Sequence, residues 1–225
     1  MLQAVEISKE YRKGQIMSSV LSNINIEVNA GEYLAVVGPS GSGKTTLLNI
    51  LGFLDKPTSG KLVFKHQNIC KLNDKERLAV RRQEIGYVFS EANLIDELTV
   101  SENVELPLLY QKVNKRNRIE RVRLLLGEMN LLHRKKLYPN ELSAIEQQKV
   151  AIARAMVIHP SLILADEPSG NLNSAEGSEI LDVLGKINDN GTAIVLFTHA
   201  RRIAERARKS VQLFDGHLLL DKVLK

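Results

Sequence analysis

The stretch GPSGSGKT, from Gly38 to Thr45, decides the fold of this chain. It matches the pattern G-x-x-x-x-G-K-[ST] at every specified position, and it lies between the apolar run Tyr33–Val37 and a segment with helical spacing. Its glycines allow the backbone to curl so that successive N–H groups point inward, and the following helix adds the positive end of its dipole. The sequence therefore predicts a buried strand, a phosphate-binding loop and a helix, in that order.

The side chains of this loop suit a nucleoside triphosphate, ATP, together with Mg²⁺. Lys44 can reach the β- and γ-phosphates, and the Thr45 hydroxyl can bind the metal ion. A glycine-rich turn that matches by chance is the alternative, and the flanking strand and helix argue against it. The expected nucleotide-binding residues of the loop are Gly38, Pro39, Ser40, Gly41, Ser42, Gly43, Lys44, Thr45 and Thr46.

An acidic pair follows a second buried run. Leu162–Ala165 is apolar throughout, and Asp166 and Glu167 come directly after it. At the end of a strand near the phosphate loop, Asp166 would hold Mg²⁺ and Glu167 would polarise the attacking water as general base. Such a pair is often only a helix cap, but the phosphate loop upstream favours the catalytic interpretation.

The overall composition does not support a nucleic-acid partner or a membrane span. The formal net charge is +5, and only 4% of residues are aromatic, which leaves little for base stacking. We therefore expect a solvated basic surface and no nucleic acid. No apolar run approaches the about 18 residues needed to cross a bilayer. The single cysteine, Cys70, fits a reducing compartment and a structural role.

The order of the patterns predicts an α/β core. Leu2–Ser8 and Ile24–Val28 alternate apolar and polar residues, so we expect two antiparallel strands joined by a polar loop. Buried runs at 161–165 and 193–197 enclose a helical pattern at 176–187, which is the arrangement of a βαβ unit.

Helical periodicity replaces the strand pattern between about 90 and 160. The segment Asn117–Met129 predicts an amphipathic helix with arginines opposite its apolar face. That face would carry Ile119, Val122, Leu125, Leu126 and Met129.

The end of the chain carries a hairpin signal. An Asp-Gly pair separates two apolar runs in Ser210–Leu220. Together the patterns predict a core formed by residues 1–89 and 160–225, with a helical subdomain at 90–159 inserted into it.

Four further motifs resemble those of ABC transporter ATPases, and the resemblance covers essentially the whole chain. LSAIEQQKVAIARA (Leu142–Ala155) is similar to the family's signature and its helix, and PSGNLN (Pro168–Asn173) is similar to its D-loop. Thr198-His199 resembles the switch histidine, and Tyr11 falls where the family has an adenine-stacking aromatic residue. The resemblance implies an α/β P-loop NTPase (RecA-like) core with an antiparallel β subdomain and an inserted α-helical subdomain.

The same resemblance implies roles for individual residues. Glu167 and His199 would act in hydrolysis, and Ser143 of the signature would contact ATP held by a second subunit. Thr45 and Asp166 would bind Mg²⁺. Ser90 stands at the metal-contacting position of the Q-loop and is a doubtful third ligand.

Partners and location follow from the resemblance as well. The stretch Asn93–Tyr110 resembles that of LolD- and MacB-type subunits, which serve membrane partners. We expect a dimer, homomeric or heteromeric, that closes on ATP because ATP contacts both halves. We also expect a membrane-spanning transporter subunit, docked near 90–107, which places the chain in the cytoplasm on the inner face of the cell membrane.

Three positions depart from the family pattern. Ser90 replaces the Q-loop glutamine and is too short to reach the metal without a bridging water. Ala144 and Ile145 replace the signature glycines, and the β-branched Ile145 is expected to hinder approach of the partner's γ-phosphate. Asn173 replaces the D-loop aspartate.

These departures leave several hypotheses open. A homodimer would have two altered signatures and turn over slowly or act as an ATP-dependent clamp, whereas a heterodimer partner with an intact signature would complete this chain's site. An ordinary ATPase is equally compatible, since backbone N–H donors survive side-chain changes. Retained Glu167 argues against a non-hydrolysing regulatory subunit, whereas Ser90 and Ile145 argue for one. The lack of a heptad run or second cassette argues against a DNA- or ribosome-directed relative.

Overall fold

The computed structural model describes residues 1–14 and 16–219. Its contacts group residues 1–81 with the chain from Ile187 onward, and residues 82–186 form a second compact unit. The domain boundaries expected from the sequence, 89/90 and 159/160, stay a prediction.

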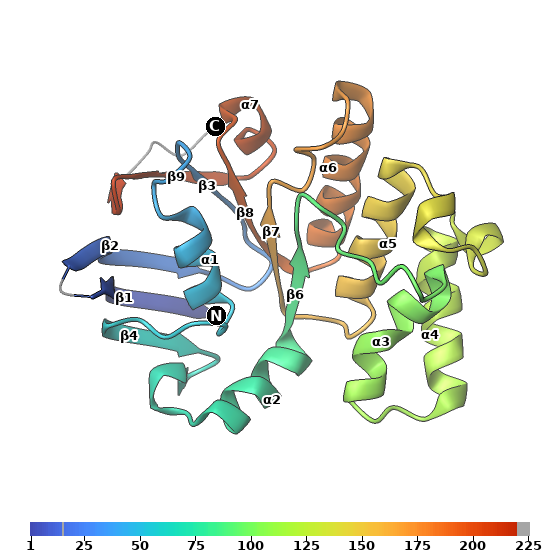
Figure 1. The fold of residues 1–225 in the computed structure, drawn as a ribbon, viewed down its shortest axis with the longest axis horizontal. Helices are drawn as coiled ribbons and strands as arrows, with labels where there is room; N and C mark the ends of the chain where they lie inside the picture. The colour runs from blue at the N-terminus through green and yellow to red at the C-terminus, as the bar shows by residue number, and fades with distance from the viewer. Residues whose placement is uncertain (15, 220–225) are drawn as a thin grey trace. The chain divides into compact units, whose positions relative to one another are not determined.

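An antiparallel sheet of four strands belongs to the first unit (Figure 1). Its order is β2-β1-β4-β5, with strands β1 Leu2–Lys13, β2 Ile16–Val28, β4 Ser59–Phe64 and β5 Gln67–Asn68. The expected antiparallel start of the chain is confirmed. The expected polar loop is wrong, because β1 continues to Lys13 and β2 already begins at Ile16.

Bulges explain why the alternating pattern stops before the strands do. Glu6 and Asn23 each have a φ of 52°, and the pairing of β1 with β2 changes register between Ala4 and Ile7 and again around Lys9. A bulge moves the following side chains to other faces of the sheet while the backbone ladder continues. The two-residue period is therefore lost although the strands persist.

Parallel strands form the other sheet element of this unit. β3 (Tyr33–Val37) lies between β8 (Ala193–Thr198) and β9 (Lys209–Phe214) and is parallel to both. Every residue of β3 and β8 is buried, as the two apolar runs predict. The helix α1 (Lys44–Leu51) follows β3 and buries its leucine and isoleucine side chains.

The hairpin signal near the end of the chain is confirmed. β10 (His217–Leu219) pairs antiparallel with β9, and the connecting Asp215 and Gly216 have φ of 45° and 73°. Positive φ at both positions matches the type I′ turn that Asp-Gly favours. Leu220, the last residue of the expected hairpin, lies outside the described residues. The remaining helical elements are η1 Ile69–Lys71, α2 Asp74–Glu84 and α7 Arg201–Ala204.

The second unit combines a parallel strand pair with helices (Figure 1). β6 (Ile85–Val88) and β7 (Leu162–Asp166) pair in parallel. The segment between them confirms the expected helical periodicity, and α6 (Ser174–Asp189) confirms the helix expected at 176–187. The intervening elements are α3 Val100–Tyr110, α4 Lys115–Glu128, η2 Leu132–Arg134, η3 Pro139–Glu141 and α5 Ala144–Met156.

The apolar face expected on α4 is correct except at one position. Val122, Leu125, Leu126 and Met129 are buried, whereas Ile119 is 54% exposed. Ile119 lies at the edge of the apolar stripe and early in the helix. The helix packs through the centre of the stripe, which leaves that edge in solvent.

A glycine at the β1–β4 contact gives a test of this fold. Gly60 has a φ of 95°, and a Cβ placed there would lie 2.4 Å from the Glu6 carbonyl oxygen. We expect Gly60→Ala to lower the free energy of unfolding by more than about 1 kcal/mol in urea titrations. In the control Gly185→Ala, on α6, nothing lies within 4 Å of the new Cβ, and stability should rise by up to about 1 kcal/mol. Equal effects of the two variants would contradict the close approach at Gly60.

Candidate nucleotide-binding site

The phosphate loop connects β3 to α1 and is anchored at both sides. The Gly38 N–H donates to the Thr198 carbonyl oxygen at 3.1 Å, and the Ser42 carbonyl accepts from the Gly216 N–H at 3.2 Å. Gly41 and Gly43 have φ of 80° and 102°, values that favour glycine. The loop is therefore preshaped by its neighbours in the first unit.

Close approach also requires glycine at the start of the loop. A Cβ on Gly38 would lie 2.2 Å from the Leu213 carbonyl oxygen and 2.6 Å from Ser42 Oγ. The Leu213 oxygen belongs to the backbone of β9 and cannot move aside cheaply. The pattern in the sequence thus reflects a steric limit as well as a backbone conformation.

Lys44 and Ser42 supply polar groups that fit a bound phosphate. The Lys44 ammonium donates to the Gly38 and Pro39 carbonyl oxygens at 2.7 and 2.8 Å, and an ammonium has three donors. Ser42 Oγ is buried and has no hydrogen-bond partner among the described residues. Such an atom costs about 1–3 kcal/mol when unsatisfied. Both features suit a ligand that accepts hydrogen bonds in this loop.

The parallel pairing of β3 with β8 brings His199 to the phosphate loop. Val37 pairs with Thr198, so Gly38 and His199 leave the two strands side by side at the same edge. His199 is exposed there. Within the loop itself, Pro39, Ser40 and Thr45 are also exposed.

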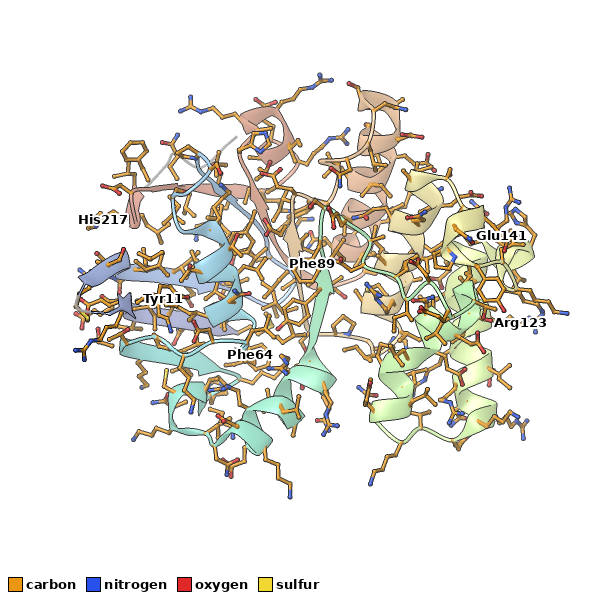
Figure 2. The ribbon with its side chains drawn as sticks, in the orientation of Figure 1. Tyr11, Phe64, Phe89, Arg123, Glu141 and His217 are labelled. Carbon is orange, nitrogen blue, oxygen red and sulfur yellow. The ribbon has the colours of Figure 1, made fainter. Side chains whose placement is uncertain are left out.

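Tyr11, the expected adenine-stacking residue, lies on β1 and is 42% exposed (Figure 2). Its hydroxyl donates to Asp55 at 3.1 Å, and the Lys9 ammonium lies 4.9 Å from the ring centroid. Burial raises the pKa of Asp55, but hydrogen bonds from Lys9, Lys56 and Tyr11 outweigh it and lower the pKa. The ring is thus held in place, and its stacking on adenine stays a prediction.

The acidic pair and Ser90 lie in the second unit, at one edge of the β6–β7 pair. Val88 pairs with Ala165 in parallel, so Phe89 and Asp166, the last residue of β7, reach the same edge of the sheet. Phe89 is labelled at the end of β6 in Figure 2. Ser90 contributes its carbonyl oxygen, which accepts a hydrogen bond from the Asn171 side chain at 3.2 Å.

Glu167 has an unusual backbone conformation. Its φ is 45°, and Pro168 follows it. A residue before proline favours an extended backbone, so the left-handed conformation costs of order 1–3 kcal/mol. The Gly170 N–H donates to the Glu167 carbonyl oxygen at 2.8 Å and closes the turn. Strain of this kind is concentrated at functional positions, which fits the role expected for Glu167.

The altered signature still forms a well-capped helix. Ser143 is the N-cap of α5, and its N–H and hydroxyl both contact the Glu146 carboxylate, at 2.9 and 3.0 Å. Arg134 Nε donates to the same carboxylate at 3.1 Å. Ala144 and Ile145 are helical, and neither has positive φ. Alanine adopts such a backbone without strain, so Ala144 is tolerated at this position of the helix.

Asn173 keeps the local structure that an aspartate would make. Its side-chain oxygen accepts from the Ala175 and Glu176 N–H groups at 3.0 Å each, at the start of α6. Asparagine and aspartate are equally good N-caps. This departure from the family pattern is therefore structurally mild.

Gln148 is a polar contributor that the sequence analysis missed. Its side-chain amide donates to the Phe89 and Pro168 carbonyl oxygens at 2.7 and 2.9 Å. The signal in the sequence was the position of Gln148 on the same helix face as the apolar residues Ile152 and Ala155. A glutamine on an apolar face is expected to be buried, and a buried polar group needs hydrogen-bond partners. In α5 that face is buried.

The predicted site residues thus gather in two groups. The first unit brings together the phosphate loop and His199. The second unit brings together Ser90, Asp166 and Glu167, and it also carries Ser143. Among the described residues no three His, Cys, Asp or Glu side chains gather as a metal cluster, and no helix of that part of the chain is long and apolar enough to span a bilayer.

A comparison with known families matches the model of the ABC transporter family to residues 21–170. This chain belongs to the ABC transporter family. It is an ATP-binding subunit and an ATPase of this family, as the motifs predicted, and its α/β fold is that of the family's ATPase cassettes.

The relatives of this ABC transporter subunit include exporters and a lipoprotein-releasing system. It is 43% identical over 204 residues to the macrolide export ATP-binding/permease protein MacB of Campylobacter jejuni, a match that spans 91% of this chain but 32% of the relative. It is 41% identical over 222 residues to the lipoprotein-releasing system ATP-binding protein LolD of Geobacter metallireducens, which covers 98% of this chain and 99% of the relative.

A solved structure of the family has the same fold. The dimeric post-hydrolysis state of the ATP-binding cassette MJ0796, bound to ADP and Pi, aligns with a TM-score of 0.91 and 37% identity. The alignment covers 100% of this chain and 99% of that one. That cassette is a dimer with the products of hydrolysis bound.

The Glu146 cap predicts a pH-dependent stability. Hydrogen bonding from the Ser143 backbone, together with Arg134, lowers the pKa of Glu146. A lowered pKa means that the carboxylate stabilises the fold above its unfolded-state pKa and loses this effect as pH falls through the folded-state value. In urea titrations at pH 7 we expect Glu146→Gln to cost about 0.5–1 kcal/mol. The cost should shrink below about pH 4. If the destabilisation by Glu146→Gln did not change with pH, it would come from altered packing and not from the charge of Glu146.

Proposed function

We propose that this ABC transporter subunit binds ATP with Mg²⁺ through Gly38–Thr46 and hydrolyses it with Glu167 as general base, to drive a separate membrane-spanning subunit. The observation that carries the proposal is the preshaped phosphate loop. Its backbone is anchored to the end of β8 and to the turn between β9 and β10, and Lys44 is held over it by two carbonyl oxygens. Backbone N–H groups, the Lys44 ammonium and the start of α1 together favour a triphosphate.

The remaining roles are proposed from the family resemblance together with the position of each side chain. His199 leaves β8 beside the loop, so it is suited to a hydrogen bond with the γ-phosphate. Ser143 starts α5 and would offer its hydroxyl to a nucleotide held by a second subunit. Tyr11 would stack on the adenine.

Magnesium fits the oxygen donors that these residues provide. The Thr45 hydroxyl and the Asp166 carboxylate are the proposed protein ligands, and Ser90 is a third only through water. A bound Mg²⁺ neutralises charge on the phosphates. It is normally held by one or two carboxylates together with substrate phosphates, so it needs no larger cluster of protein ligands.

The partners are proposed from the relatives. A MacB-type relative carries a permease in its printed name, and the LolD-type relative is an ATP-binding protein of a lipoprotein-releasing system. By analogy this chain would serve a membrane-spanning subunit, docked near 90–107, from the cytoplasmic side of the cell membrane. A second ATP-binding subunit, identical or not, would complete each nucleotide site.

Two substitutions separate binding from hydrolysis. We expect Lys44→Ala to weaken ATP binding at least about 10-fold, because it removes a charged phosphate contact. Glu167→Gln should leave ATP binding within about twofold and lower kcat by about 100-fold or more, because the amide cannot accept the proton of water. Titration calorimetry and phosphate release measure the two effects.

A matched control is Glu128→Gln at the exposed end of α4, which should leave both quantities unchanged. If Glu167→Gln turned over ATP as fast as the native chain, Glu167 would not be the base.

Restoring the altered motifs tests whether the departures from the family pattern limit turnover. A native turnover of order 1 s⁻¹ or faster, little changed by Ser90→Gln with Ala144→Gly and Ile145→Gly, would show that the departures are tolerated. We expect instead a rise in turnover after restoration, because glycine removes the Ile145 side chain from the nucleotide-facing start of α5. Steady-state phosphate release measures this. Two glycines early in a helix cost about 1 kcal/mol each, so the variant should be checked for folding.

A further inference from the structure

Gln148 is a buried polar side chain in the middle of α5. It is 3% exposed, and its neighbours along the helix face include Ala151 and Ile152, which are buried as well. Its amide nitrogen donates to the Phe89 carbonyl oxygen at 2.7 Å and to the Pro168 carbonyl oxygen at 2.9 Å. A primary amide has two N–H donors, so both are used.

The two carbonyl groups belong to the loops that matter most for hydrolysis in the second unit. Phe89 directly precedes Ser90, which stands at the Q-loop position. Pro168 directly follows Glu167. A single side chain thus ties together the two segments that leave β6 and β7. The Asn171 side chain adds a second tie, through the Ser90 carbonyl oxygen at 3.2 Å.

The strained conformation of Glu167 explains why such a tie is needed. With a φ of 45° before a proline, Glu167 has a backbone that relaxes towards an extended conformation unless its surroundings hold it. Gln148 holds the Pro168 carbonyl oxygen, one peptide beyond Glu167, and the Gly170 N–H holds the Glu167 carbonyl oxygen at 2.8 Å. Without the Gln148 bond, the direction of the Glu167 side chain is less restricted.

We infer that Gln148 is a positioning residue for ATP hydrolysis, which fixes the backbone of Glu167 and keeps the Ser90 segment in register with it. The inference rests on the proposed role of Glu167. Gln148 also lies on the helix that begins at Ser143. Any displacement of α5 on engaging a second subunit's nucleotide is therefore transmitted by this side chain to both loops.

The variant Gln148→Met tests the inference, because methionine fills a similar volume without donors. The matched control is Asn188→Leu. Asn188 is 4% exposed, and its amide donates to the Gly31 and Thr192 carbonyl oxygens at 3.0 and 2.9 Å, in the first unit. Both variants lose a buried amide with two carbonyl partners, so both should lower the unfolding midpoint in urea by similar amounts.

Only Gln148→Met should change the chemistry. We expect its kcat to fall about 10-fold or more, since a small misplacement of a catalytic group is costly. Its affinity for ATP should stay within about twofold, because the phosphate loop is intact. Equal kcat values for Gln148→Met and Asn188→Leu would overturn the inference.

A second measurement does not depend on turnover. The Gly170 amide hydrogen should exchange faster in Gln148→Met than in the native chain and in Asn188→Leu, as measured by NMR hydrogen exchange. Unchanged exchange would overturn the inference even if the chain hydrolysed ATP slowly. If exchange changed but Glu167→Gln hydrolysed ATP normally, the tie would stand and the proposed role of Glu167 would fall.

If the methionine variant does not fold, Gln148→Glu can be used to test the positioning role of Gln148. A neutral carboxyl group can donate one hydrogen bond to these carbonyl oxygens and a carboxylate none, and burial favours the neutral form. The kcat of Gln148→Glu relative to the native chain should therefore rise as pH is lowered from about 8 to about 6. A ratio that does not change with pH would contradict a positioning role.

Discussion

Parallel strand pairing is the constraint on which the rest of the structure depends. Neighbouring parallel strands end at the same edge of a sheet, so the segments that follow them meet without any direct attraction between their side chains. The β3–β8 register puts Gly38 beside His199, and the β6–β7 register puts the Phe89–Ser90 segment beside Asp166 and Glu167. Each half of the expected nucleotide chemistry is assembled in this way within its own unit.

Neutral hydrogen bonds help to hold several of the functional segments in place. Backbone bonds anchor the phosphate loop to β8 and to the turn before β10, and the amide of Gln148 ties the two loops beyond β6 and β7. A neutral amide holds these carbonyl groups without adding charge near the acidic pair. Under the proposed function, Lys44 supplies a positive charge for the phosphates.

The departures from the family pattern have different structural weight. Asn173 caps α6 as an aspartate would, and Ala144 adopts helical geometry without strain, so neither disturbs the local fold. Ile145 and Ser90 differ from the family residues in side-chain size. Ile145 adds bulk near the start of α5, and Ser90 has a shorter side chain than glutamine beyond the end of β6. Under the proposed function, their effect would concern contacts with nucleotide and partner.

The sequence by itself determined the family, the buried strands, the phosphate loop and the acidic pair, because each is encoded in a local pattern of glycines, apolar runs and charges. It also identified the Asp-Gly hairpin and most of the buried face of α4. The tertiary structure decided where β1 and β2 end, that Ile119 is exposed, and that Gln148 joins the loops at Phe89 and Pro168. Bulges, packing edges and hydrogen bonds between residues 20 or 59 positions apart depend on which segments meet in space, and no local pattern contains that information.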